Sequence, residues 1–255
     1  MLYENLSCQK EDHIMIIDLP KLAKYHVRIT ELADELFDIC THMTLDNEAQ
    51  VVIINWDQED PSSGMDLGED VLNNGEFGTE PRSLAASVAK LDIPVITALN
   101  GYAIGQALEL ALACDIRIAS ETSHFGLSHI DAGMIPWDGG TQRLSRLVGG
   151  TKALELILTG EIINAQEALR IGLVNRVAKP EELSGVVMEM AREMAAKAPI
   201  SLRFAKEAIH KGMDLPLEQG LRLEADLYFL LHTTRDRTEG IKSFQEKRKG
   251  QFEGR

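Results

Sequence analysis

The sequence predicts an α/β fold whose first part is rich in strands and whose second part is mostly helical. Short apolar, β-branched runs recur in the first half of the chain, and amphipathic helical patterns lie between them. After about residue 150 the helical segments follow one another without clear strands between them. Strands that alternate with helices are typical of α/β domains. A chain of 255 residues is long enough to bury a sizeable core.

The first part contains four short apolar runs that predict buried strands. In order they are HIMIID (13–18), VVIIN (51–55), PVITAL (94–99) and IRIAS (116–120). Residues 30–43 begin with Thr and carry one apolar stripe, made by Leu32, Leu36, Ile39 and Met43. This pattern predicts a helix, and residues 82–91 repeat it more weakly.

The second part offers six helical segments separated by glycine and proline residues. They span 151–158, 165–171, 181–197, 200–211, 216–233 and 237–248. The longest segment without a periodic pattern is 57–81, which is rich in Asp, Glu, Gly, Asn and Ser. A loop of that length in a compact domain is usually functional or mobile.

The composition excludes several classes of function. The chain has 40 acidic and 26 basic residues and a formal net charge of −14, so its field repels nucleic acids and anionic membranes. Cys8, Cys40 and Cys114 form no CxxC pair and no metal-ligand spacing, which indicates buried free thiols in a reducing compartment. The sequence shows no signal-peptide pattern and no apolar run near the ~20 residues of a membrane span. We therefore expect a cytoplasmic protein without a metal site.

One carboxylate, Glu109, lies in an otherwise apolar run, QALELALA (106–113). If residues 105–114 form a helix that starts at Gly105, its first N–H groups have no intrahelical partner and can polarise a carbonyl oxygen. Glu109 then lies about one turn further in, where burial raises the pKa of a carboxyl group toward that of a useful acid or base. From the residues alone, an exposed Glu109, or one paired with a buried Arg, is the favoured interpretation.

A second loop offers N–H groups of the same kind. SSGMDLG (62–68) follows the run VVIIN, and its Ser-Gly pair allows the backbone to face a ligand. Two N–H groups from two separate strand-to-helix turns can form an oxyanion hole.

Five segments resemble the crotonase (enoyl-CoA hydratase/isomerase) superfamily in order and spacing. They are SSGMDL (62–67), NGYAIGQALELALACDIRIA (100–119), SHFGLSHIDAGMIPWDGGTQRLSRLVGGTKALELILTG (123–160), INAQEALRIGLVNRV (163–177) and EGIKSFQEKRKGQF (239–252). The resemblance covers about residues 51–252, whereas DLPKLAKYHVRIT (18–30) departs from the family pattern. It implies a spiral of ββα units with an acyl-CoA site in residues 1–195, a helical trimerisation region in 196–255, and a homotrimer or a hexamer of two trimers.

The resemblance also implies an acyl-CoA thioester as ligand, with its carbonyl oxygen held by the backbone N–H groups of Met65 and Gln106. Gln106 replaces the usual Gly, and its N–H survives if the local φ does not require Gly. The side chain of Gln106 either lines the acyl pocket or turns into packing. The loop residues around these N–H groups are expected to contact substrate: Ser63, Gly64, Asp66, Leu67 and Gly105.

By motif position, Glu109 is the first catalytic glutamate of the hydratases, and His129 replaces the second in FGLSH (125–129). A Glu–His pair offers a base and an acid of different intrinsic pKa. The competing interpretation of His129 is a structural hydrogen-bonding residue.

Two further segments are candidates for substrate binding. Trp137 and Asp138 stand where the family has small residues; Trp137 is either a wall that selects the acyl group or core packing, and Asp138 either contributes to the chemistry or caps a turn. Phe244 and Lys247 match the C-terminal segment that contributes to the CoA site, with a solvated tail as the alternative. On this acidic chain, Lys247, Arg248 and Lys249 supply local positive charge for the CoA phosphates.

The expected function is that of an acyl-CoA lyase, which adds water to an α,β-unsaturated, straight-chain or cyclic acyl-CoA, or removes water in the reverse direction, through a stabilised enolate. No cofactor is expected, because coenzyme A is part of the substrate. The alternatives are a double-bond isomerase that uses Glu109 alone, a C–C or thioester hydrolase in which His129 activates water, and a non-catalytic binding protein. The net charge of −14 disfavours an RNA-binding protein of this fold.

Overall fold

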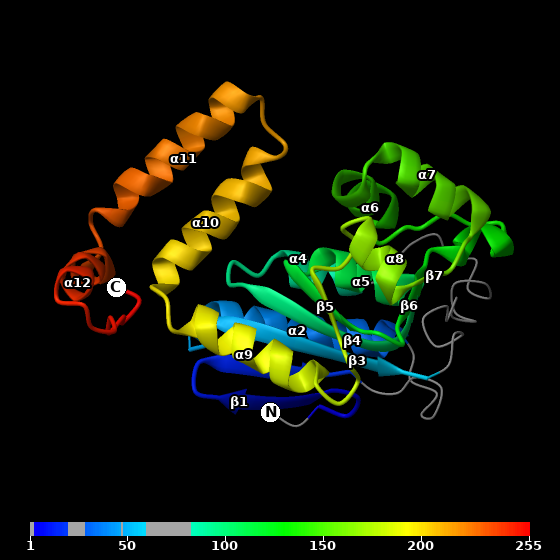
Figure 1. Ribbon diagram of the computed structural model, residues 1–255, viewed down its shortest axis with the longest axis horizontal. Helices are drawn as coiled ribbons and strands as arrows, with labels where there is room; N and C mark the ends of the chain where they lie inside the picture. Colours follow the sequence, from blue (N-terminus) through cyan, green and yellow to red (C-terminus); the bar gives the residue numbers. More distant parts are fainter. Residues whose placement is uncertain (1–2, 20–28, 47, 60–82) are drawn as a thin grey trace.

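The computed structural model describes residues 3–19, 29–46, 48–59 and 83–255. Its centre is a mainly parallel sheet that runs in the order β1-β2-β3-β4-β5-β8 (Figure 1). These strands are β1 (Ser7–Glu11), β2 (Ile14–Asp18), β3 (Val51–Gln58), β4 (Val95–Ile104), β5 (Ile116–Ser120) and β8 (Arg176–Ala178). Only β1 and β2 pair antiparallel in this series. The end of β4 continues beyond β5 and pairs with β6 (His124–Gly126), which pairs in turn with β7 (Ile163–Asn164).

Helices cover both faces of the sheet. Helices α2 (Ile29–Asp46), α4 (Leu84–Ala89) and α5 (Gln106–Ala113) lie on one face, and α9 (Leu183–Ala195) lies on the other (Figure 1). Successive residues of β3 point to opposite faces, so Val52 and Ile54 join the core under α2 and α4, while Val51 and Ile53 join the core under α9. Burial on both faces explains why VVII (51–54) is apolar without interruption.

A group of short helices lies at the end of the sheet formed by β6 and β7 (Figure 1). It comprises the 3₁₀ helix η2 (Ser128–Ala132), α6 (Gly140–Val148), α7 (Gly150–Thr159) and α8 (Ala165–Arg170). Helix α6 packs against both α5 and α7, and Leu144 anchors it in the core. The loop 133–139 therefore lies between η2 and α6, close to the start of α5.

The last three helices, α10 (Pro199–Gly212), α11 (Leu217–Leu231) and α12 (Arg235–Gln245), extend away from the sheet (Figure 1). We call residues 199–255 the C-terminal arm. Helix α10 packs on α11 and is fixed to the sheet side by polar contacts at Asp115. Lys206 Nζ lies 2.7 Å from one carboxylate oxygen of Asp115, and His210 Nε2 lies 2.8 Å from the other. Lys206 also donates to the Ile93 carbonyl at 2.8 Å.

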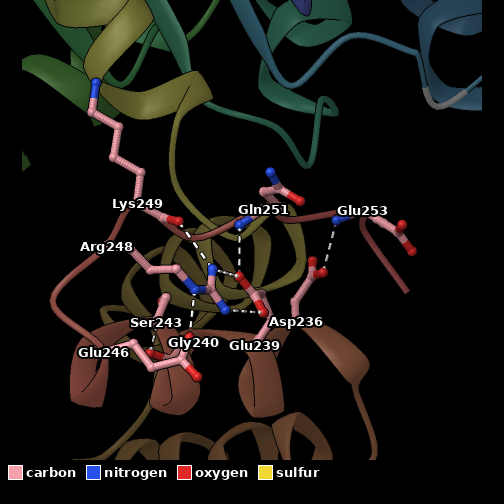
Figure 2. A network of polar contacts seen from close by, with 9 residues as sticks. All are labelled: Asp236, Glu239, Gly240, Ser243, Glu246, Arg248, Lys249, Gln251 and Glu253. Carbon is pink, nitrogen blue, oxygen red and sulfur yellow. Dashed lines mark hydrogen bonds and ion pairs between the residues drawn. The ribbon is translucent and has the colours of Figure 1, made fainter.

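The final residues fold back onto α12 through a polar network (Figure 2). Arg248 donates to Glu239 at 2.5 and 3.0 Å and to Glu246 at 2.6 Å. The buried carboxylate of Asp236 accepts the N–H groups of Glu253 and Gly254, both at 2.8 Å. The segment after α12 is thus tied to the first turns of that helix.

The predicted strands and the long predicted helices are confirmed, with shifts at their ends. The sequence analysis did not identify β1, η2, α6 or the short strands β6, β7 and β8. Residues 57 and 58 belong to β3 and not to the predicted loop, and residues 60–82 lie outside the described part of the chain. Cys40 and Cys114 are buried as predicted, but the prediction for Cys8 was wrong: its thiol is exposed because β1 is a polar edge strand. Within the described residues, no helix combines the length and the apolar character that crossing a membrane requires.

Candidate active site

Glu109 lies in the first turn of α5 and is completely buried. Strand β4 leads into this helix through Gly105, whose φ of 62° and ψ of −127° suit glycine and no other residue well. The neighbours of Glu109 along the helix are the core residues Leu108 and Leu110. The apolar run therefore places one carboxylate inside the protein, next to the positive end of a helix.

The two carboxylate oxygens of Glu109 have different surroundings. Oε1 accepts the backbone N–H groups of Asp138 and Gly140, each at 2.8 Å. Oε2 is buried and has no hydrogen-bond partner among the described residues. Gly140 permits this approach, because a Cβ atom at residue 140 would lie 2.9 Å from Oε1 and 2.8 Å from the Pro136 Cβ. One oxygen is thus fixed by the backbone, and the other is left for a ligand.

His129 of η2 faces the second oxygen. Its Nε2 lies 3.6 Å from Glu109 Oε2, which exceeds the length of a good hydrogen bond. Its Nδ1 is buried and, in the described part of the chain, has no partner. Buried polar atoms are normally satisfied, so an unpaired carboxylate oxygen and an unpaired ring nitrogen in one buried Glu–His pair indicate a place where a ligand or water binds.

Burial shifts both groups toward their neutral forms. It raises the pKa of Glu109 to about 7, and the negative charge of Asp138 adds to this rise, while the N–H groups of Gly140 and Asp138 and the charge of Arg143 oppose it. Burial also lowers the pKa of His129 below its ordinary value. Near neutral pH the pair therefore consists of a carboxyl group that readily gains or loses a proton and an uncharged imidazole.

Gln106, the first residue of α5, has no intrahelical partner for its N–H group. Among the described residues other than glycine, only Asp12 and Lys247 have a positive φ, so residue 106 does not require glycine. The side chain of Gln106 is half-buried, and its Oε1 atom is buried without a partner within the described residues. The backbone donor survives the replacement of the usual glycine. Ser63, Gly64, Met65, Asp66 and Leu67 lie outside the described residues.

The two candidate residues in the loop before α6, Trp137 and Asp138, have different surroundings. Trp137 is 44% exposed, so it does not pack in the core of this chain. Asp138 is buried, and its carboxylate accepts the hydroxyl of Ser83 and, at 3.0 Å, the N–H of Ala85 at the start of α4. The structure thus places the Asp138 carboxylate on the end of a helix, as in the turn-capping interpretation, and only its backbone N–H touches Glu109.

Phe244 belongs to the last turn of α12 and Lys247 follows this helix, which lies away from α5 of the same chain (Figure 1). The Phe244 side chain is 85% exposed. Arg248 does not offer the free charge expected of it, because it is paired with Glu239 and Glu246 (Figure 2). One chain therefore does not bring these residues to its own Glu109.

Sequence reasoning missed the residues that fix Glu109. The backbone N–H groups of Asp138 and Gly140 carry no side-chain signal, and Arg143, which donates to the Asp138 carbonyl at 2.7 Å, looked like an ordinary helix residue. The one available signal was the pair Gly139-Gly140, which indicates a close approach of the backbone to another group.

A separate cavity of about 260 Å³ lies between α2 and the β1–β2 hairpin. None of the candidate residues lines it; its walls include Tyr3, Cys8, Met15, Ile39, His42 and Met43. Among the described residues, no group of three or more His, Cys, Asp or Glu side chains is arranged to hold a metal ion.

Known proteins of one enzyme family are similar to this chain. A model of the enoyl-CoA hydratase/isomerase family matches residues 14–255. The crotonyl-CoA hydratase of Syntrophomonas wolfei is 34% identical in an alignment of 257 positions that covers 99% of this chain and 99% of that protein. The 2,3-dehydroadipyl-CoA hydratase of Escherichia coli is 34% identical over 98% of this chain and 99% of its own. The crystal structure of an enoyl-CoA hydratase from Bacillus anthracis matches with a TM-score of 0.87 at 34% identity, over 99% of this chain and 100% of that one.

Proposed function

The chain belongs to the enoyl-CoA hydratase/isomerase family, and from this premise we propose that it adds water across the double bond of an α,β-unsaturated acyl-CoA thioester. The observation that carries the proposal is the buried pair Glu109 and His129, whose facing atoms Oε2 and Nε2 are 3.6 Å apart. Oε2 of Glu109 and Nδ1 of His129 have no partner among the described residues. These groups can bind a water molecule and move its proton.

We assign Glu109 the role of base. Its Oε2 takes one proton from the water while the water oxygen bonds to C3 of the substrate. The π electrons of the C2–C3 bond move toward the thioester carbonyl and form an enolate. Glu109 then returns the proton to C2, so the product contains the substrate plus one water. Neutral His129 orients the water and shares its hydrogen bonds, a role that the lowered pKa of His129 supports.

The enolate oxygen requires donors that are already in place. We propose that the N–H of Gln106 at the start of α5 is one and the N–H of Met65 is the other. Removal of a single donor of this kind costs about 3–4 kcal/mol of transition-state stabilisation. Gly105, with its positive φ, precedes α5 as its N-cap, and the first N–H groups of this helix have no intrahelical partner. We also propose that the substrate is contacted by Ser63, Gly64, Asp66 and Leu67.

The acyl group is proposed to lie against Trp137. Its exposed indole can form a flat wall, which suits a short straight-chain or a cyclic acyl group. Coenzyme A arrives as part of the substrate, and we propose no other cofactor.

We further propose a homotrimer or a hexamer of two trimers. The C-terminal arm exposes many large apolar side chains, which need cover in solution. They include Ile209, Met213, Leu217, Leu221, Phe229 and Phe244. Because Phe244 and Lys247 lie far from Glu109 of their own chain, we assign them to the CoA site of a neighbouring copy. Residues 1–195 then form the catalytic core, and residues 196–255 act between copies.

The main alternative is a double-bond isomerase, in which Glu109 alone moves a proton between two carbons. A further alternative is a C–C or thioester hydrolase in which His129 activates water. A panel of straight-chain and cyclic acyl-CoA thioesters, followed by mass spectrometry, separates these reactions. We expect a product heavier by one water. An unchanged mass with a changed spectrum would indicate isomerisation, free CoA would indicate hydrolysis, and either result without hydration would refute the proposal.

A further inference from the structure

The turn formed by residues 138–140 is fixed from two sides while it points two N–H groups at Glu109. On one side the Asp138 carboxylate accepts the Ser83 hydroxyl and the Ala85 N–H, which anchors the turn to the first turn of α4. On the other side Arg143 of α6 donates to the Asp138 carbonyl at 2.7 Å. Helices α4 and α6 both pack on α5. The turn therefore joins the three helices around the carboxylate.

We propose that Asp138 is a positioning residue for Glu109: by tying the 138–140 turn to α4, its carboxylate keeps Glu109 Oε1 occupied and leaves Oε2 free for the reaction. The inference rests on the proposed function, since it assigns Oε2 the proton transfer. It goes beyond that function because it names a side chain that never touches the substrate.

The geometry argues against a direct acid or base role for Asp138. The carboxylate is buried, one oxygen accepts from Ser83, and the other accepts from Ala85 at 3.0 Å. Ser83 is itself engaged as the cap of α4, where its hydroxyl accepts the Ala86 N–H at 2.7 Å. A carboxylate bound in this way is oriented toward a helix N-terminus, where its charge is stabilised.

The consequence for Glu109 is geometric. The Asp138 N–H belongs to the same residue as the tethered carboxylate, so moving the side chain off α4 moves this donor as well. Without both donors Oε1 would compete with Oε2 for the ligand, and the proton-accepting atom would no longer be unique. A displacement of a reacting group by about 1 Å can cost a factor of about 10² in rate.

The charge of Asp138 has a second, smaller effect. The charged or titratable described groups around Glu109 are His129 of η2, Asp138 itself and Arg143 of α6. Asp138 raises the pKa of Glu109, whereas Arg143 lowers it. Neutralising Asp138 without changing its shape therefore separates its charge from its tether.

The test uses three variants of the full-length protein. Asp138→Asn keeps the shape, accepts the Ala85 N–H through its amide oxygen and donates to the Ser83 oxygen. Asp138→Ala removes both the tether and the charge. Ser83→Ala removes part of the tether and keeps the charge. Asp12→Asn in the exposed β1–β2 turn serves as the charge-matched control, since Asn tolerates its φ of 50°.

We expect Asp138→Ala to lower kcat by about tenfold to a hundredfold with a small change in KM. Asp138→Asn is expected to recover most of that kcat and to move the pH profile of kcat/KM to lower pH. Ser83→Ala should lower kcat without the move to lower pH, and Asp12→Asn should change neither. Unchanged kcat in Asp138→Ala, or equal losses in Asp138→Ala and Asp138→Asn with no pH shift, would overturn the proposal.

An infrared pH titration measures the pKa of the Glu109 carboxyl in the absence of catalysis. The band of this carboxyl is identified by its loss in Glu109→Gln. Asp138→Asn should lower the pKa of Glu109, and Asp12→Asn should not. If the wild type hydrates no acyl-CoA, the proposed function fails. This titration still shows whether the charge of Asp138 changes the pKa of Glu109. An unshifted Glu109 in Asp138→Asn would refute the coupling even in an active enzyme.

Discussion

The imidazole of His129 and the carboxylate of Glu109 meet inside the protein, with Nε2 and Oε2 3.6 Å apart and both side chains almost wholly buried. Glu109 belongs to α5 and His129 belongs to η2. His129 follows Glu109 by 20 residues along the chain. The pair does not form a direct hydrogen bond, so neither side chain satisfies the hydrogen-bonding capacity of the other. Glu109 Oε2, which has no hydrogen-bond partner among the described residues, is therefore available to a molecule that contacts both side chains.

Replacing either member of this pair should slow hydration strongly. Glu109→Gln keeps the shape and the Oε1 contacts but removes the basic oxygen, and we expect a loss of about 10²–10⁴ in kcat. His129→Gln keeps hydrogen bonding without titration and should cost a loss in the same range. The double variant should lose far less than the product of the two, because both groups act on one water. Steady-state kinetics of the three variants measures this coupling.

The isomerase alternative makes a different prediction for the same variants. A proton shuttle that uses one carboxylate is abolished by Glu109→Gln and almost unaffected by His129→Gln. Wild-type rates in both single variants would show that neither residue of the pair takes part in the reaction.

The pH dependence of kcat/KM should follow the ionisation of Glu109. A base must be deprotonated, and the pKa of Glu109 is raised to about 7, so activity should rise with pH and level off above that value. His129 has a lowered pKa and is already neutral there, so it adds no second limb on the alkaline side. A pH profile measured in buffers of constant ionic strength tests this, and a limb near the ordinary pKa of a carboxyl would contradict the burial of Glu109.

Gly140 should not tolerate even the smallest side chain. A Cβ at residue 140 meets Glu109 Oε1 at 2.9 Å and the Pro136 Cβ at 2.8 Å. Gly140→Ala therefore forces the turn away from Glu109, and we expect a loss of about 1–3 kcal/mol in stability together with a lower kcat. Denaturant unfolding and kinetics measure the two effects.

Gly150→Ala is the matched control for this substitution. Gly150 also begins a helix, α7, but a Cβ there has no heavy atom within 4 Å. Because Ala favours helices over Gly by up to about 1 kcal/mol, this variant should be neutral or more stable. Equal behaviour of the two variants would show that the close approach at Gly140 has no consequence.

The sequence predicted the buried strands and made Glu109 a candidate because the signals for both are local. An apolar run predicts a buried strand, and a single carboxylate within an apolar run indicates a functional candidate. Strand β1 was missed because SCQKE is polar and exposed at the sheet edge. Helix α6 was missed because Gly139 and Gly140 look like a loop, and only Gly140 and Leu144 in it are buried. The tie between Asp138 and α4 spans 53 residues, so no local pattern could reveal it.

Mixed oligomers test whether the C-terminal arm serves a neighbouring copy. One parent carries Glu109→Gln with an intact arm, and the other carries Phe244→Ala and Lys247→Ala with an intact Glu109; each alone should be nearly inactive. After co-refolding in equal amounts, about a quarter of the sites in a cyclic trimer combine an intact Glu109 with an intact arm from the next copy. We therefore expect activity to return to about that fraction of wild type. If each arm served its own chain, no mixture would contain an intact site and activity would stay at the level of the parents. The position of Phe244, 85% exposed and away from α5 of its own chain, favours the first outcome.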